Sequence, residues 1–453
     1  MGKIKKYSFY KDSGIEWIGE IPSHWEVNRF GYLFSFSRGL TITKKDLKET
    51  GIPCVSYGEI HSKYGFMVNP EIHSLKCVEE TYLENADKSL LKRGDFIFAD
   101  TSEDIEGSGN FSCLDSDLPT FAGYHTIIAC NSNENNYKYL AYCFDSLDFR
   151  NQIRSSVSGV KVYSITQTIL KNCNVLLPPL REQTAIAAFL DRKTAEIDQL
   201  IADKKHLLEL YQEEKIAIIN KAVTKGINPD AKMKESGIEW LGEIPEHWEV
   251  KRLKLLVSKI GSGVTPSGGA SVYLTTGIPL LRSQNIHFDG FKLDDVAYIS
   301  EEINEGMSNS KIQEGDVLLN ITGASIGRCF YVPNGFGRGN VNQHVCIIRP
   351  IIDIIDTIYL HLLLRSEIGQ LQIRYQQTGA NREGLNFEQL KNFSLPFPTN
   401  IEEQKSIVEF IETKCKKIDA KIARTEKLIE LLTEYRSTLI SEVVTGKIMV
   451  IES

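Results

Sequence analysis

The chain has 453 residues, which is enough for two to four domains that each bury a core. Its apolar fraction of 42% and charged fraction of 25% are typical of a globular protein and exclude a disordered chain. The net charge of −7 argues against a protein that binds nucleic acid alone, because phosphate contacts require a basic surface.

Nine cysteines are scattered along the chain without a CxxC pair. This pattern predicts reduced thiols and a cytoplasmic location rather than a disulfide framework or a zinc site. The most apolar window, 347–364, is interrupted by Arg349, Pro350, Asp353 and Asp356, so no membrane span is expected.

Residues 1–10 form a basic tail, and a repeat begins directly after it. Residues 11–27, KDSGIEWIGEIPSHWEV, return at 234–250 as KESGIEWLGEIPEHWEV, with fourteen of seventeen positions identical. All four tryptophans, Trp17, Trp25, Trp240 and Trp248, lie in these copies. Identical residues cannot recognise different partners, so we expect the tryptophans and the neighbouring His24 and His247 to be packing anchors.

Residues 11–176 are predicted to be a mixed α+β domain. Short β-rich runs occur at 52–57, 95–100 and 125–130, separated by clusters of Gly, Asn, Asp and Ser. A helical pattern extends from Tyr137 to about Ile153.

Residues 181–224 contain no Gly or Pro and carry apolar residues at helical spacing. They predict one long helix, which Gly226 ends. A second such segment covers 402–445, and the apolar positions of the two coincide, for example Ile197 with Ile418 and Leu210 with Leu431. Two helices with matching stripes are expected to pack as an antiparallel coiled coil.

The second half also repeats the first domain. GIPCVSYGEIH at 51–61 corresponds to GIPLLRSQNIH at 277–287. The predicted organisation is therefore a first domain at 11–176, a helix at 177–226, a second domain at 227–394 and a second helix at 395–453. The architecture is an internal repeat with pseudo-two-fold symmetry.

Two similar domains on a helical spacer suit a bipartite DNA site, because B-DNA presents equivalent groove faces about 34 Å apart. A scaffold that joins two protein-binding modules remains an alternative on this pattern alone. Domains that share a scaffold and differ in their loops would bind half-sites of different sequence.

The motifs SGIEWIGEIPSHWEV and LLPPLREQTAIAAFLD, together with the doubled plan, resemble the specificity subunit of type I restriction–modification systems. The resemblance covers essentially the whole chain. It implies two target recognition domains, each for one half of a split DNA site, and conserved spacer helices that set the gap. It further implies two methyltransferase subunits that use S-adenosylmethionine, and restriction subunits that use ATP and Mg.

Catalytic motifs are missing from the sequence. It has no Asn/Asp-Pro-Pro-aromatic motif, no phosphate-binding G-x-x-x-x-G-K-[ST] loop and no HExxH. We therefore predict a non-enzymatic subunit without a cofactor or a metal of its own.

Candidate DNA-binding residues in the second domain occupy four loops. Arg can bind guanine, and Gln or Asn can bind adenine, by paired hydrogen bonds. The alternatives are ordinary turn chemistry for 282–285, a simple hairpin for 320–328 and a structural role for His344. The candidates are Arg282, Ser283, Gln284, Asn285, Thr322, Ser325, Arg328, Asn342, Gln343, His344, Gln377, Asn381 and Arg382.

The first domain offers candidates at corresponding positions. They are Ser56, Tyr57, Thr101, His125, Ser158, Lys161 and Tyr163. The loop 101–109 is acidic, with Glu103, Asp104 and Glu106. Such a loop either contacts cytosine amino groups or faces away from DNA, and we favour the second interpretation. Because neither domain is basic, we expect the partner subunits to supply much of the DNA affinity.

Overall fold

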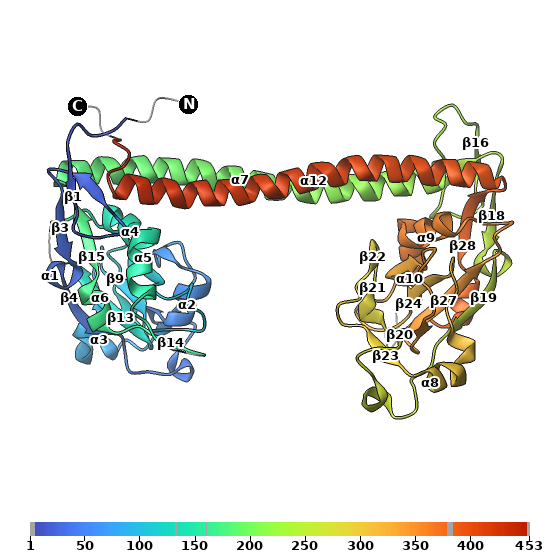
Figure 1. The fold of residues 1–453 in the computed structure, drawn as a ribbon, viewed down its shortest axis with the longest axis horizontal. Coiled ribbons are helices and arrows are strands. Elements are labelled where there is room, and N and C mark those ends of the chain that lie inside the picture. The colour runs from blue at the N-terminus through green and yellow to red at the C-terminus, as the bar shows by residue number, and fades with distance from the viewer. Residues whose placement is uncertain (1–4, 132–133, 160, 378–383, 451–453) are drawn as a thin grey trace. The chain divides into compact units, whose positions relative to one another are not determined.

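The computed structural model describes residues 5–131, 134–159, 161–377 and 384–450. The chain divides into two compact units. Unit 1 comprises Met1–Lys205 and Lys427–Ser453, and unit 2 comprises His206–Glu426. Each unit combines one half of the sequence repeat with parts of the two long helices (Figure 1).

Unit 1 contains two main sheets and helices packed on them. A five-stranded sheet has the order β4-β13-β9-β11-β6, and a four-stranded sheet has the order β7-β5-β12-β8. Three two-stranded pairs, β1-β2, β3-β15 and β10-β14, complete the unit. Its strands are β1 (Tyr10–Asp12), β2 (Glu20–Pro22), β3 (Glu26–Arg29), β4 (Phe34–Arg38), β5 (Ile52–Val55), β6 (Phe66–Val68), β7 (Lys76–Val78), β8 (Leu90–Leu91), β9 (Phe96–Ala99), β10 (Thr101–Ser102), β11 (Phe111–Leu114), β12 (Thr120–Ala122), β13 (Thr126–Asn131), β14 (Tyr163–Ser164) and β15 (Asn174–Leu177). Its helices are α1 (Phe30–Leu33), α2 (Tyr57–Ser62), α3 (Tyr82–Asn85), α4 (Tyr137–Asp145), α5 (Leu147–Arg154), α6 (Gln167–Asn172), the first part of α7 (Leu180–Lys225) and the second part of α12 (Ile401–Val444).

Unit 2 repeats this topology with fewer strands. Its sheets have the orders β19-β27-β24-β25 and β23-β20-β26, and its pairs are β16-β17, β18-β28 and β21-β22. The strands are β16 (Met233–Glu235), β17 (Glu243–Pro245), β18 (Trp248–Arg252), β19 (Val257–Ser262), β20 (Ile278–Leu281), β21 (Ile286–His287), β22 (Gly290–Phe291), β23 (Ala297–Ile299), β24 (Val317–Asn320), β25 (Cys329–Tyr331), β26 (Asn340–Val341), β27 (Val345–Pro350) and β28 (Ser394–Pro398). The helices are the second part of α7, α8 (Glu301–Gly306), α9 (Thr357–Arg365), α10 (Glu367–Gln377), α11 (Phe387–Lys391) and the first part of α12 (Ile401–Val444).

The strand registers confirm that the two domains share one fold. In unit 1, β5 pairs in parallel with β12, and in unit 2, β20 pairs in parallel with β26. The pair β10-β14 corresponds to the isolated bridge between Thr322 and Gly384. The repeat seen in the sequence is therefore a repeat of tertiary structure, and the predicted α+β class is confirmed.

The two units fill the shared scaffold with different cores. In unit 1 the helix α4 packs on the large sheet through aromatic rings, such as Phe96 and Phe144 with ring centroids 4.8 Å apart. In unit 2 the corresponding core is mainly aliphatic, with Leu319, Ile348 and Leu363 fully buried. Core packing tolerates this exchange where total volume and pattern are kept.

The long helices form as predicted from their periodicity. Helix α7 has 46 residues and α12 has 44 residues. In unit 1, Arg436 Nε of α12 donates to Asp198 Oδ1 of α7 at 2.8 Å, and in unit 2, Lys215 Nζ of α7 donates to Asp419 Oδ1 of α12 at 2.7 Å. Later residues of α7 thus pair with earlier residues of α12, as the predicted antiparallel arrangement requires.

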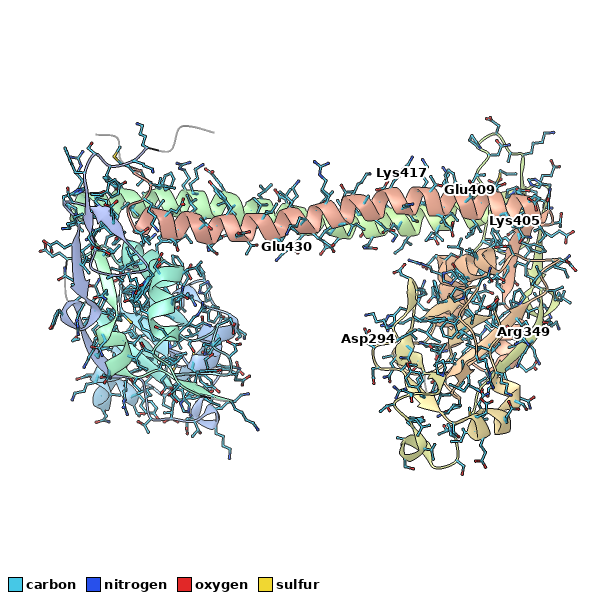
Figure 2. The ribbon with its side chains drawn as sticks, viewed as in Figure 1. Asp294, Arg349, Lys405, Glu409, Lys417 and Glu430 are labelled. Carbon is cyan, nitrogen blue, oxygen red and sulfur yellow. The ribbon has the colours of Figure 1, made fainter. Side chains whose placement is uncertain are left out.

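The apolar stripe of these helices is only partly buried. Ile197 and Ile440 lie in the core of unit 1, and Ile219 and Ile418 are likewise buried in unit 2. The expectation that Leu210 and Leu431 share this stripe is wrong, because they are 44% and 49% exposed. Figure 2 shows charged side chains, among them Lys417 and Glu430, projecting from α12.

The predicted single helix from Tyr137 to Ile153 is also wrong in part. Ser146 separates α4 from α5 with extended backbone, and its Oγ accepts a hydrogen bond from Phe149 N at 3.3 Å. Ser146 is therefore an N-cap that begins a new helix. Helices α9 and α10 are divided in the same way at Ser366.

The tryptophan repeats act as joints, but only one tryptophan of each copy is an anchor. Trp25 and Trp248 are fully buried, and their indole N–H groups donate to Glu182 of α7 and Glu403 of α12. Trp17 and Trp240 are 54% and 41% exposed, so the expectation that they are packing anchors is wrong.

The two histidines of the repeat contact the long helices, although their side chains are 46% and 56% exposed. His24 lies 2.9 Å from Glu182 Oε2, and His247 lies 2.9 Å from Glu403 Oε2. All nine cysteines are free thiols. Within the described ranges, no helix is both long enough and apolar enough to cross a membrane.

Candidate nucleic-acid interface

A groove in unit 1 brings together candidates that are far apart in the sequence. Tyr57 at the start of α2, Thr101 in β10 and His125 before β13 all line it, and its volume is about 730 Å³. The rings of Tyr57 and His125 meet edge to face with centroids 5.3 Å apart. His125 has a φ of +56°, a backbone conformation that histidine tolerates better than most residues.

Hydrogen bonds hold this groove in shape. His61 of α2 lies with Nε2 2.9 Å from the backbone oxygen of Thr101 and with Nδ1 2.9 Å from Asn110 Nδ2. His125 Nδ1 lies 3.1 Å from Asp100 Oδ1. The walls of the groove are therefore fixed to one another across three loops, which reduces the entropy lost when a ligand binds.

The acidic loop lies in the same groove. Glu103, Asp104 and Glu106 line it beside Tyr57 and His125. The acidic loop thus borders the candidate residues of unit 1, and the interpretation that it faces away from DNA stays a prediction. Nearby, burial lowers the pKa of Arg154, and the positive charge of Arg150 adds to that shift. Arg154 donates a hydrogen bond to the backbone oxygen of Glu106 at 2.5 Å and so supports the loop.

The remaining candidates of unit 1 differ in accessibility. Tyr163 lies in β14, where it pairs with Ser102 beside the groove. Ser158 and Lys161 are exposed in the segment before that strand. Ser56 is only 2% exposed, so its prediction as a DNA contact is wrong. Its backbone N–H donates to Glu59 Oε2 at 3.0 Å, which caps α2.

In unit 2 the candidate loops meet around Asn320 of β24. Asn320 Nδ2 donates to the backbone oxygen of Ser283 at 2.8 Å and to Ser325 Oγ at 3.1 Å. Asn320 is fully buried, so it joins the turn 282–285 to the loop 321–328 without being accessible itself. Arg328, which ends that loop, is half-buried.

A second network joins the other candidates of unit 2. His344 Nδ1 lies 2.6 Å from Thr322 Oγ1, and its Nε2 lies 3.0 Å from Gln343 Nε2. Gln377 exchanges hydrogen bonds of 3.0 Å and 3.2 Å with the backbone of Gly384. Since Gly384 also bridges to Thr322, Gln377 lies in one region with the other three candidate loops of the second domain. Asn381 and Arg382 lie outside the described residues.

Two predicted contacts in unit 2 are wrong. Asn285 is 1% exposed, and its Nδ2 donates to the backbone oxygen of Lys292 at 2.9 Å. Asn342 is 8% exposed, and its Oδ1 accepts from His344 N at 3.1 Å. Both amides shape turns, so the alternative of ordinary turn chemistry holds for Asn285.

Arg282 and Gln284 are held by a residue that the sequence did not indicate. Arg282 Nη2 donates to the backbone oxygen of Asp295 at 2.8 Å, and Gln284 Nε2 donates to Asp295 Oδ2 at 2.5 Å. Asp295 lies in a polar loop with Lys292 and Asp294, where sequence alone gives no reason to choose one acid. His61 also escaped prediction, although it ends the repeated segment 51–61 and its counterpart His287 stands at the same place.

The two regions offer different chemistry at corresponding positions. The groove of unit 1 presents carboxylates, imidazoles and a phenol, whereas unit 2 presents a guanidinium and amides. Such groups can make hydrogen bonds with base edges. Across the described part of the chain, no group of three or more His, Cys, Asp or Glu residues is placed to hold a metal ion.

Comparison with known proteins finds one family match in each half of the repeat. The family model described as "Type I restriction modification DNA specificity domain" matches residues 22–210 and again residues 245–433. The chain is 26% identical to a putative type I restriction enzyme MjaX specificity subunit of Methanocaldococcus jannaschii, over 98% of both chains. It is 30% identical to the EcoBI specificity subunit of Escherichia coli, over 57% of this chain and 55% of that protein.

Solved structures show the same fold. A chain from a study of complex assembly and conformational transition of the type I R-M system superposes with a TM-score of 0.68 at 16% identity, covering 94% of this chain and 98% of that chain. The HsdS subunit from Thermoanaerobacter tengcongensis superposes with a TM-score of 0.53 at 17% identity, with the same coverage.

Proposed function

The chain belongs to the family of type I restriction–modification specificity subunits and carries two target recognition domains, and from this premise we propose that each domain recognises a different half of one bipartite DNA site. The observation that carries the proposal is that the two domains share their strand pairing but differ in the residues of the turns that follow the strands. Strands β5 and β20 correspond in register, yet the turn after β5 begins with a buried Ser56 and the turn after β20 with Arg282.

The spacer formed by α7 and α12 sets the gap between the half-sites in this proposal. The paired segments at Asp198–Arg436 and at Lys215–Asp419 support a stiff spacer, because ion pairs and buried stripes keep two helices in register. Four residues inserted into each helix, after Lys205 and after Glu426, would add about 6 Å of helix. The recognised gap should then widen by about two base pairs at 3.4 Å each, with both half-sites unchanged.

The spacer also docks two methyltransferase subunits and, with them, the restriction subunits. Exposed apolar side chains on the helices support this part of the proposal, since a helix surface normally exposes polar residues. In unit 1 they are Leu200, Leu431 and Tyr435, and in unit 2 they are Leu210, Ile216 and Phe410. The partner subunits bring S-adenosylmethionine, ATP and Mg, and the chain itself contributes recognition rather than catalysis.

The test uses the complex of this chain with its methyltransferase subunit. The complex is incubated with a library of duplexes that contain two randomised blocks, and the bound and methylated fractions are sequenced. We expect two enriched blocks at a fixed gap. Exchange of residues 11–176 for the corresponding domain of another specificity subunit should change one block and leave the other block and the gap unchanged. Enrichment of a single continuous motif, or none, would contradict the proposal.

A further inference from the structure

One acidic residue in unit 2 holds two candidate base-contacting side chains at once. The guanidinium of Arg282 donates to the backbone oxygen of Asp295 at 2.8 Å and lies 3.7 Å from its carboxylate. It also lies over the ring of Tyr273, 5.7 Å from the centroid. The Arg282 side chain is therefore fixed from two sides while 22% of its surface stays accessible.

The same carboxylate orients Gln284. Its Nε2 donates to Asp295 Oδ2 at 2.5 Å, so one of the two N–H groups of the amide is occupied by the protein. This hydrogen bond fixes the amide plane, so Gln284, which is exposed, offers its amide oxygen in a defined direction to a ligand. An acceptor in this position suits the amino group of adenine or cytosine, whereas the guanidinium suits the two acceptors N7 and O6 of guanine.

The platform beneath these two side chains is rigid. The buried Asn285 donates to the backbone oxygens of Lys292 at 2.9 Å and Asp295 at 3.3 Å, which ties the turn 282–285 to the loop 292–295. Side chains that are ordered before binding lose less entropy on contact with a base. A flexible arginine would contact phosphates and bases alike, but a fixed one discriminates.

We propose that Asp295 is a positioning residue that makes Arg282 and Gln284 a single recognition pair, so that the half-site of unit 2 requires a guanine beside an amino-bearing base. This inference rests on the proposed function, because it assumes that unit 2 contacts a half-site. Unit 1 has Ser56 and Gly58 at the positions of Arg282 and Gln284, and Ser56 is buried. The requirement is thus confined to one half-site, and the other half-site is an internal control.

The first test changes only the DNA. Within the half-site assigned to unit 2, each guanine is replaced in turn by 7-deazaguanine, which lacks N7, or by inosine, which keeps N7 and O6 and lacks only the minor-groove amino group. At one guanine, the 7-deaza substitution should weaken binding of the complex about tenfold and inosine should have little effect, because a paired major-groove contact discriminates by about that factor. Equal effects of the two analogues at every guanine would overturn the proposal.

The second test changes the protein. Asp295→Ala removes the carboxylate that orients Gln284, so it should reduce the preference for the amino-bearing base from about tenfold to less than threefold, without changing selectivity at the half-site of unit 1. The effect at the guanine should be smaller, because the backbone oxygen that accepts from Arg282 remains. Asp295→Asn should restore part of the preference, since its amide oxygen still accepts a hydrogen bond. The matched control is Asp294→Ala, which removes the same charge from the neighbouring exposed residue labelled in Figure 2.

The outcomes separate this inference from the function on which it rests. Loss of the preference for the amino-bearing base in Asp295→Ala, with the spacing and the other half-site intact, supports it. Equal behaviour of Asp295→Ala and Asp294→Ala, or a bipartite site without a required guanine in this half, overturns it and leaves the proposed function standing. A library without two enriched blocks overturns both.

Discussion

The joint between the domain and the long helix occurs once in each unit, and the two joints have nearly the same sequence. The glutamate at the centre of each joint differs in its burial and in its hydrogen-bond partners, so the two joints can be compared by experiment. Glu182 accepts hydrogen bonds from Tyr7 Oη and from Trp25 Nε1 at 3.2 Å, and it pairs with His24 at 2.9 Å. The Glu182 side chain is only 9% exposed. Burial, followed by the hydrogen bond to Glu182, raises the pKa of Tyr7, so its hydroxyl stays a donor.

The corresponding Glu403 has fewer partners and more solvent. It accepts from Trp248 Nε1 at 2.9 Å and pairs with His247, and its side chain is 29% exposed. Glu182→Ala would leave the buried indole and phenol without an acceptor, and we expect a loss of about 3 kcal/mol. Glu403→Ala would leave one buried donor, and water can reach it, so we expect a loss of about 1 kcal/mol.

Hydrogen exchange measures each joint separately, which matters because a chain with two units does not unfold in one step. The opening free energy is followed by mass spectrometry in peptides covering 20–27 and 243–250. Glu182→Gln is the control, since it keeps the shape and one acceptor oxygen and should lose less than Glu182→Ala. Equal losses at the two joints, or a larger loss at Glu403, would refute the reasoning from burial and partner number.

Two further predictions concern unit 2. Burial, assisted by the positive charge of Arg365, lowers the pKa of His361 to about 3, so the folded state excludes a proton that the unfolded chain binds below its usual pKa near 6.5. The free energy of unfolding of unit 2 should therefore fall as the pH drops from 6.5 to 5, by at most about 1.4 kcal/mol per pH unit. Urea titrations at several pH values measure this free energy, and it should depend less on pH in His361→Gln. In the turn 282–285 after β20, Asn285→Ala should lower the free energy of unfolding by about 1–3 kcal/mol, because it leaves backbone acceptors unpaired. Gln284→Ala should leave the urea midpoint unchanged and alter the base preference in the library assay. The reverse pattern would show that the assignment of buried and accessible amides is mistaken.

The sequence by itself determined the architecture of this protein. The doubled segment 11–27, the helical periodicity of 181–224 and its match at 402–445 are local patterns, and local patterns fix secondary structure and repeat. The loops that carry the candidates were also predictable, because polar residues between strands mark them. The domain plan and its family resemblance required no contact information.

Tertiary structure alone decided which side chains are available. Trp17 and Trp25 stand in one motif, yet only Trp25 is buried in the core of unit 1, where it donates to Glu182, 157 residues away. Asn285 and Gln284 are neighbours with similar amides, but Asn285 is buried and donates to backbone oxygens of Lys292 and Asp295, whereas Gln284 is exposed and donates to the carboxylate of Asp295. Burial and hydrogen-bond partners come from segments distant in the sequence, so neither residue type nor spacing could assign these roles.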